Sequence, residues 1–147
     1  MRAKYWLCVL AAVWAMGASV NGWAAGELHL SFHMGGATNG SGFVGGTLVN
    51  TGDAPVAHGY VVVTLLDAQC RPMRSVMESF DTIEPGEQRS FRVAVGADLK
   101  RYRLLSLKGF DAEGFELRAV DDNEAILKAR EPEERVYCAQ AQKAAAD

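Results

Sequence analysis

Apolar and polar residues alternate in several short stretches of the chain, the pattern expected of half-buried β-strands. The first stretch runs from Glu27 to Met34. Its apolar face carries Leu28, Leu30, Phe32 and Met34, and its polar face carries Glu27, His29, Ser31 and His33. The alternation predicts a strand whose apolar residues face a core and whose histidines face solvent.

A different pattern lies between Tyr60 and Leu66, where apolar and β-branched residues occupy both faces. Such a run is typical of a central strand that is covered on both sides. We therefore expect this segment to be the central strand of its sheet, with Leu65 in the core.

Weaker alternation predicts further strands near residues 48–50, 73–80, 91–95, 102–107 and 115–119, separated by turn-forming residues. The core-facing residues expected in the last three of these strands are Phe91, Val93, Val95, Leu105, Leu107, Phe115, Leu117 and Ala119. Pro85 and Gly86 suit the two central positions of a type II turn. About seven short strands with regular turns predict the fold class, an all-β, antiparallel, immunoglobulin-like β-sandwich over residues 25–120.

Glycine is concentrated between Gly35 and Gly46, a segment with six glycines that by composition predicts a long flexible connection. Residues 40–45 also spell GxGxxG, the spacing of dinucleotide-binding loops. That interpretation requires a helix after the loop to bind the pyrophosphate, whereas residues 46–50 have strand character. A connection is therefore expected, and no cofactor.

The sequence changes character at Asp121, beyond which alanine and charged residues dominate and glycine is absent. This composition predicts an acidic helical tail over residues 121–147. Pro132 is the only helix breaker, and it predicts one helix near residues 123–130 and a second from Pro132 onward. Val136, Tyr137 and Ala141 fall at helical spacing and are expected to pack on one stripe.

Composition places the chain among globular proteins, with 49% hydrophobic and 22% charged residues. Its formal net charge is -3, and loss of Arg2 and Lys4 with a signal peptide leaves 13 basic residues against 18 acidic ones, or -5. A nucleic-acid binder needs a basic surface. The charge balance therefore excludes nucleic acid as a partner.

The N-terminus has the features of a secretory signal, namely a basic start, an apolar stretch at residues 5–16 and small residues before Ala24 and Ala25. We expect a signal peptide over residues 1–24, cleaved after Ala24 or Ala25, and a periplasmic or secreted protein. An uncleaved anchor is the alternative, but polar residues interrupt the apolar run before it reaches the ~20 residues of a spanning helix. Cys8 lies among bulky residues and is not expected to be a lipidation site.

The mature chain then contains two cysteines, Cys70 and Cys138, in an oxidising compartment. A disulfide is the expected state, with two free buried thiols or metal ligation as alternatives. We expect the bond to hold the second tail helix across the outer face of the central strand. That face carries Tyr60, Val62 and Leu66.

Several segments resemble the FxLYD family of bacterial extracytoplasmic domains. They are Gly46-Thr47-Leu48-Val49-Asn50-Thr51-Gly52, the strand ending in Val63-Thr64-Leu65-Leu66-Asp67, and Ile83-Glu84-Pro85-Gly86-Glu87 followed by Phe91. Aliphatic residues replace the Phe and Tyr of the namesake motif, and the resemblance covers residues 46–111. It implies an immunoglobulin-like sandwich with an accessory or interaction role outside the cytoplasmic membrane, and it supplies no catalytic residue.

Two kinds of chemistry are alternatives to that role. His29, His33, Met34, Met73 and Met77 are potential copper ligands. The two histidines are four residues apart on one strand, too far to share a metal, and the methionines are expected to fill the core. Hydrolysis is the second alternative, but no G-x-S-x-G elbow is present and no nucleophile lies near His29, His33 or His58 in the sequence. Asn39-Gly40-Ser41 fits a glycosylation sequon, which is incidental in a bacterial protein.

The sequence thus favours a non-catalytic exported module that binds another envelope or secreted protein, with no cofactor, no metal and no stable membrane insertion after signal cleavage. β-Sandwiches bind partners through end loops or by adding a strand at an exposed edge. The two candidate surfaces are the segment from Gly35 to Gly46 and the strand from Leu28 to Met34. A small periplasmic copper-binding protein and a hydrolase with an unrecognised site are the alternatives.

Overall fold

The structure, a computed structural model, describes residues 24–96 and 99–146. The expected signal peptide, residues 1–24, lies outside the described residues except for Ala24, and so does Cys8. Seven strands precede one helix, and along the chain they are β1 (Glu27–Thr38), β2 (Ser41–Asn50), β3 (His58–Leu66), β4 (Pro72–Phe80), β5 (Gln88–Gly96), β6 (Arg101–Phe110), β7 (Arg118–Asp121) and α1 (Glu124–Ala144). No helix in the described part of the chain is both long enough and apolar enough to span a bilayer.

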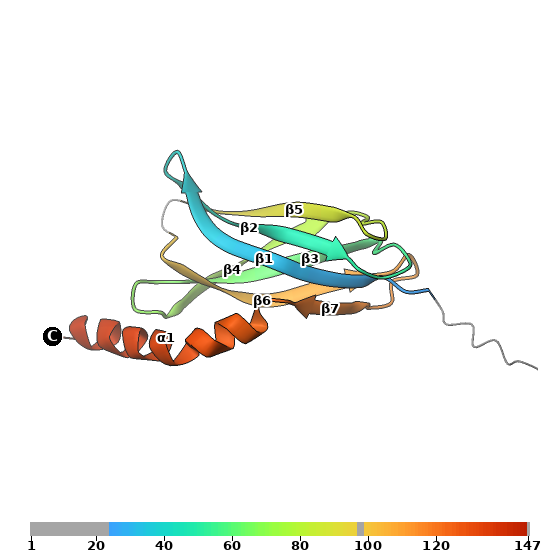
Figure 1. The fold of residues 1–147 in the computed structure, drawn as a ribbon. Coiled ribbons are helices and arrows are strands. Elements are labelled where there is room, and N and C mark those ends of the chain that lie inside the picture. The colour runs from blue at the N-terminus through green and yellow to red at the C-terminus, as the bar shows by residue number, and fades with distance from the viewer. Residues whose placement is uncertain (1–23, 97–98, 147) are drawn as a thin grey trace, which may run out of the picture.

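The strands form two layers, which confirms the expected all-β sandwich (Figure 1). One sheet has the order β5-β2-β1-β7, and the other has the order β4-β3-β6. All neighbours are antiparallel except β1 and β7, which run parallel. This parallel pair covers only residues 27–30 of β1. Beyond Leu30, β1 therefore pairs with β2 on one side and with no described strand on the other.

The core lies between the sheets and consists of aliphatic residues from both, together with Phe80 and Phe91. β3 is the central strand of its sheet, as expected, and Leu65 is 6% exposed within the core. The type II turn is also confirmed, because Gly86 has a φ of 78° and Glu87 N–H donates to the carbonyl of Glu84.

Replacement of Leu65 by alanine is expected to lower the free energy of unfolding by about 2 to 5 kcal/mol, because the change removes buried methyl groups and leaves a cavity. The matched control is Leu105→Ala, since Leu105 is 63% exposed and its loss should cost little. Urea denaturation of both variants measures the two changes. Equal midpoints would contradict the placement of Leu65 in the core.

The segment from Gly35 to Gly46 is not the flexible connection that its composition predicts. It is the end of a β-hairpin in which Thr38 pairs with Ser41 around a two-residue turn. The turn residues Asn39 and Gly40 have φ angles of 50° and 78°, as a type I′ turn requires. The other glycines allow close packing, since a Cβ atom on Gly46 would lie 2.3 Å from the carbonyl oxygen of Phe32.

A β-bulge reverses the expected orientation of side chains in the second half of β1. Leu30 and Phe32 pair with the consecutive residues Leu48 and Thr47, so Ser31 is an extra residue without a partner. Leu28 and Leu30 enter the core as expected. The prediction was wrong for Phe32 and Met34, which are 50% and 49% exposed, because one extra residue moves every later side chain to the opposite face.

β6 contains a second bulge with the same effect. Val62 and Val63 pair with Ser106 and Leu104, which leaves Leu105 as the extra residue. Leu105 was expected in the core but is exposed, whereas Tyr102 and Leu104 pack against the core instead. The last strand also differs from expectation, because β7 begins only at Arg118 and Phe115 is exposed.

The tail is one continuous helix, α1, and the expected break at Pro132 does not occur. Proline removes one backbone donor from the helix. The ion pair between Glu131 and Arg135, four residues apart, stabilises the turns around it. No residue of α1 is buried, and Val136 is exposed rather than packed on an apolar stripe.

Cys70 and Cys138 form the expected disulfide, with a Cα–Cα distance of 5.6 Å. The helix does not cross the outer face of β3 as predicted, and Tyr60 and Val62 remain half-buried there. α1 instead lies beside β6 and the β3–β4 turn (Figure 1). The contacts that hold it include ion pairs from Arg101 and Arg103 to Glu134 and a hydrogen bond from Gln142 to the carbonyl of Gln69. Only Leu66, at the disulfide end of that outer face, is fully buried.

Candidate binding groove

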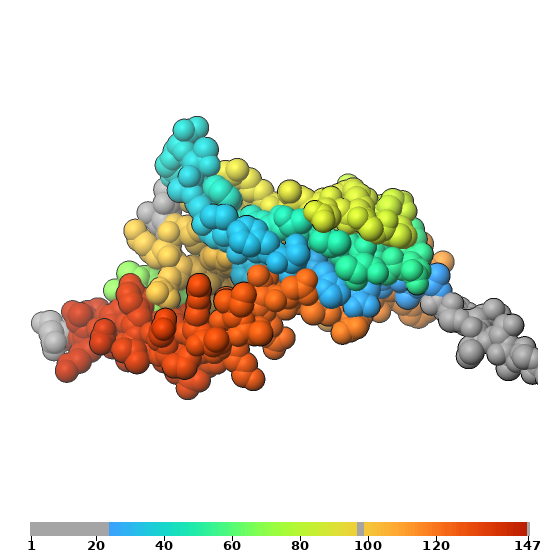
Figure 2. Space-filling model, in the orientation of Figure 1, coloured from blue at the N-terminus to red at the C-terminus, as the bar shows by residue number. Residues whose placement is uncertain are grey.

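A groove runs between the second half of β1 and the α1 helix, where β7 no longer covers the edge of the sheet. Its larger part has a volume of about 1170 Å³ and includes His33, Tyr102 and Asp121 in its lining. A smaller part of about 460 Å³ continues it along Gly35, Gly36 and Ala37. Arg101, Tyr102 and Glu134 line both parts. In Figure 2, atoms of the start of β6 are visible between the β1–β2 hairpin and α1.

His33 lies in this groove because of the bulge at Ser31. Its side chain is only 7% exposed, so the expectation that it faces solvent was wrong. Its Nδ1 lies 2.7 Å from the hydroxyl of Tyr102, on the β6 segment that the second bulge turns inward. Its Nε2 is buried and has no hydrogen-bond partner among the described residues. The two bulges together therefore place an imidazole with one unpaired nitrogen at the floor of the groove.

Asp121, the last residue of β7, completes this cluster. Its side chain is 16% exposed, and its Oδ2 lies 3.7 Å from His33 Nε2. Its Oδ1 accepts hydrogen bonds from the backbone and side-chain nitrogens of Asn123. No lysine or arginine of the described residues pairs with it. Asp121 is thus a largely buried carboxylate whose neighbouring ionisable partner is His33.

Tyr102 is a hydrogen-bonding group in this cluster and not a source of charge. Burial, with the negative charge of Asp121 as a smaller cause, raises the pKa of Tyr102 to about 12. The phenol is therefore neutral at physiological pH, and it holds the imidazole ring of His33 in place through the bond to Nδ1.

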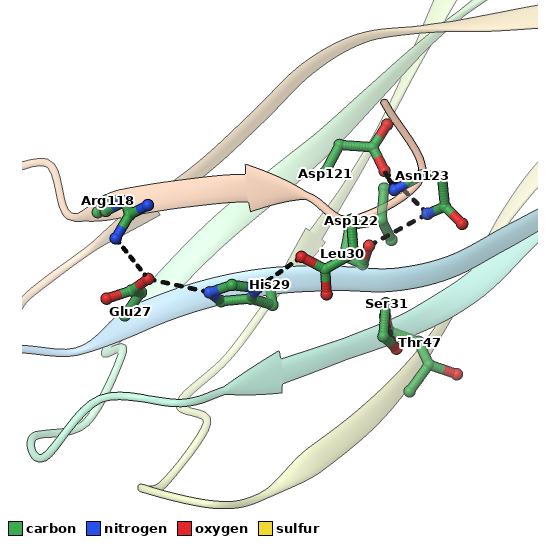
Figure 3. Close-up of polar contacts among 9 residues, drawn as sticks. All are labelled: Glu27, His29, Leu30, Ser31, Thr47, Arg118, Asp121, Asp122 and Asn123. Atoms are coloured by element: carbon green, nitrogen blue, oxygen red, sulfur yellow. Dashed lines mark hydrogen bonds and ion pairs between the residues drawn. The ribbon is translucent and has the colours of Figure 1, made fainter. Parts of the chain in front are cut away.

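A separate cluster centres on His29, on the outer face of the same sheet (Figure 3). Its Nε2 lies 3.0 Å from Glu27, and its Nδ1 lies 2.7 Å from Asp122, just beyond β7. Ionised carboxylates only accept hydrogen bonds, so the protonated form of His29, which carries a proton on both ring nitrogens, can donate to both carboxylates. The pKa of His29 is raised, mainly by its hydrogen bond to Glu27. Partial burial lowers this pKa, and the hydrogen bond and negative charge of Asp122 raise it further.

The His29 cluster predicts a contribution to stability that depends on pH. Because the pKa of His29 is raised above its ordinary value of 6.5, this contribution is complete below pH 6.5 and is lost as pH rises through the higher folded-state pKa. Melting temperatures of wild type and of His29→Gln, measured from pH 5 to 9, should differ most at the acidic end. A constant difference across that range would contradict the prediction.

The other candidate residues are dispersed. Met34, Met73 and Met77 are exposed and do not fill the core as expected. Within residues 24–96 and 99–146, no group of three or more His, Cys, Asp or Glu side chains is arranged to bind a metal. His58 is stacked on Phe110, and the glycines of the GxGxxG segment belong to the hairpin. No sequence pattern indicated the His33–Tyr102–Asp121 cluster, since two bulges create it.

Comparisons with known proteins add little to this description. No family model matches the chain, and no curated protein matches it. A solved structure described as the structural characterization of IrmA from Escherichia coli aligns with 68% of this chain and 92% of its own, at a TM-score of 0.42 and 6% identity.

Proposed function

We propose that the protein is a non-catalytic, exported accessory module that binds an extended segment of another envelope or secreted protein. The segment would pair with the free edge of β1 and lie in the groove. The expected signal peptide and the resemblance to the FxLYD family support the location and the accessory role. The observation that carries the proposal is the early end of β7, which leaves residues 31–38 of β1 without a second neighbour among the described strands.

An open sheet edge favours strand addition, because its backbone N–H and C=O groups are available to a new strand. A partner segment that follows the line of β7 beyond Asp121 would extend the sheet along β1. The adjoining groove has room for the side chains that such a strand directs inward. Main-chain hydrogen bonds would then provide affinity, and the groove would provide selectivity.

Exposed apolar side chains beside this edge provide a second contact. Phe32 and Met34 lie on the outer face of β1, and Met34 pairs with Gly45, which has no side chain to cover it. Exposed apolar residues that gather in one place are typical of interaction sites. The same partner segment can therefore contact β1 at its edge and on its outer face.

Site-specific photo-crosslinking in the native envelope tests the proposal. A photoreactive phenylalanine analogue at Met34 should form a discrete adduct with one partner, and the same analogue at Phe115 should not. Phe115 is the control because it is exposed but precedes β7, away from the groove. Identical adducts at both positions, or none at Met34, would refute binding at this edge.

A further inference from the structure

The cluster at the floor of the groove has chemistry that strand pairing alone does not use. His33 Nε2 is a buried polar atom without a partner. Asp121 is a largely buried carboxylate with no lysine or arginine partner among the described residues. An unpaired buried polar atom and an unbalanced buried charge both cost stability, and a bound group that satisfies both recovers that free energy. The two groups face the same part of the groove lining.

The geometry selects a cationic donor as the group that fits. A carboxylate accepts hydrogen bonds, and Nε2 of a neutral imidazole also accepts when Nδ1 carries the proton and donates to the Tyr102 hydroxyl. The two acceptors are 3.7 Å apart, so one nitrogen can contact both. An ammonium group has three donors and a positive charge to balance Asp121. A carboxylate or phosphate, in contrast, would be repelled by Asp121.

We infer that His33 and Asp121 bind the ammonium group of a lysine side chain carried by the partner strand. This inference rests on the proposed function, since it assumes a strand paired with β1. Residues directly opposite each other on paired strands place their side chains on the same face. A lysine opposite His33 therefore points inward, toward Asp121. The selectivity of the groove is then for an extended segment with lysine at this one position.

Five basic residues line this part of the groove, namely Arg101, Arg103, Lys128, Arg130 and Arg135. None of them forms an ion pair with Asp121 in the described part of the chain. Arg101 and Arg103 pair with Glu134 on α1, and Arg135 pairs with Glu131. Arg101 also stacks over the ring of Tyr137, with its guanidinium carbon 4.1 Å from the ring centre. These three arginines are therefore paired with groups on α1 and not with Asp121.

The first test uses n-butylammonium as a probe for the lysine side chain, with n-butanol as the neutral control at constant ionic strength. NMR titration should show saturable shifts of the His33 ring and the Asn123 amide with the ammonium only. Asp121→Asn keeps a side-chain carbonyl for Asn123 and should weaken binding about tenfold or more. Asp122→Asn, the matched control, should leave binding within about twofold. Equal shifts with butanol, or unchanged binding in Asp121→Asn, would overturn the inference.

The second test separates this inference from the proposed function. Extended nonapeptides with lysine, norleucine or glutamate at a scanned position are titrated while the β1 amides are observed. Shifts of these amides report strand addition, and a preference for lysine that Asp121→Asn abolishes supports the cation site. Strand addition without that preference would leave the proposed function standing and refute the inference. Butylammonium binding without any peptide effect on β1 would support the cation site and refute strand addition.

Discussion

Asn50→Ala should destabilise the protein by about 3 to 5 kcal/mol, a large effect for a residue in a turn-like sequence. Asn50 is fully buried at the end of β2. Its carbonyl accepts hydrogen bonds from the backbone N–H of Glu27 and of Gly52, and its amide donates to the carbonyls of Ala54 and Ile83. The alanine variant leaves these four backbone groups without that partner in a partly or fully buried site.

Guanidinium denaturation of three variants measures this effect. At low pH the neutral carboxyl group of Asn50→Asp keeps the acceptor and has one O–H donor in place of the two N–H donors. The stability of this variant should therefore lie between those of wild type and Asn50→Ala. Thr51→Ala, at the adjacent exposed position, is the control and should change stability by less than about 0.5 kcal/mol. A loss below about 1 kcal/mol in Asn50→Ala would show that the four bonds are dispensable.

Reduction of the Cys70–Cys138 bond is expected to lower the free energy of unfolding by about 4 kcal/mol. The bond joins residues 68 apart in the sequence, and in the chain-entropy model closure of so long a loop strongly restricts the unfolded chain. α1 should also become sensitive to protease while the sandwich stays folded, because no residue of the helix is buried and few other contacts hold it.

Melting temperature and limited proteolysis, each with and without reductant, measure these two effects. The control is the double variant Cys70→Ala with Cys138→Ala, whose melting temperature should not respond to reductant. Two thiols titrated in unfolded, unreduced protein from an oxidising compartment would contradict the bond itself. An unchanged melting temperature on reduction would contradict the loop-entropy argument.

The features that were predicted correctly depend on short sequence patterns, whose meaning does not change with the register of the neighbouring strands. The apolar run from Tyr60 to Leu66 predicts a central strand, and both the central place of β3 and the burial of Leu65 followed from it. The expected cover of its outer face did not, since Tyr60 and Val62 are only half-buried. Pro85 and Gly86 prefer the backbone angles of their turn. Two cysteines in a chain that is expected to be exported indicate a disulfide.

The candidate site could not be predicted, because it depends on the positions of the two bulges. Alternation around Ser31 continues without a break in the sequence, and only the pairing with β2 makes this residue an extra one. His33 thereby changes from a surface residue to a groove residue. The hairpin was missed for a different reason, since Asn39-Gly40 is a strong turn signal that the surrounding glycines obscured. At Pro132 the helix continues because one missing backbone donor does not outweigh the helical hydrogen bonds before and after it.

The parallel pairing of β1 and β7 determines how the protein responds to mechanical force. β1 starts where Glu27 pairs with Arg118, and β7 leaves toward α1 at the other end of this four-residue pairing, where Leu30 pairs with Asp121. Tension between the N-terminal side and α1 therefore pulls the two strands past each other, so their hydrogen bonds bear the load together and do not open one by one. The Cys70–Cys138 bond gives tension from the end of α1 a second path into the β3–β4 turn. In the oxidised form, tension applied at the end of α1 would therefore be shared between the β1–β7 pairing and the β3–β4 turn.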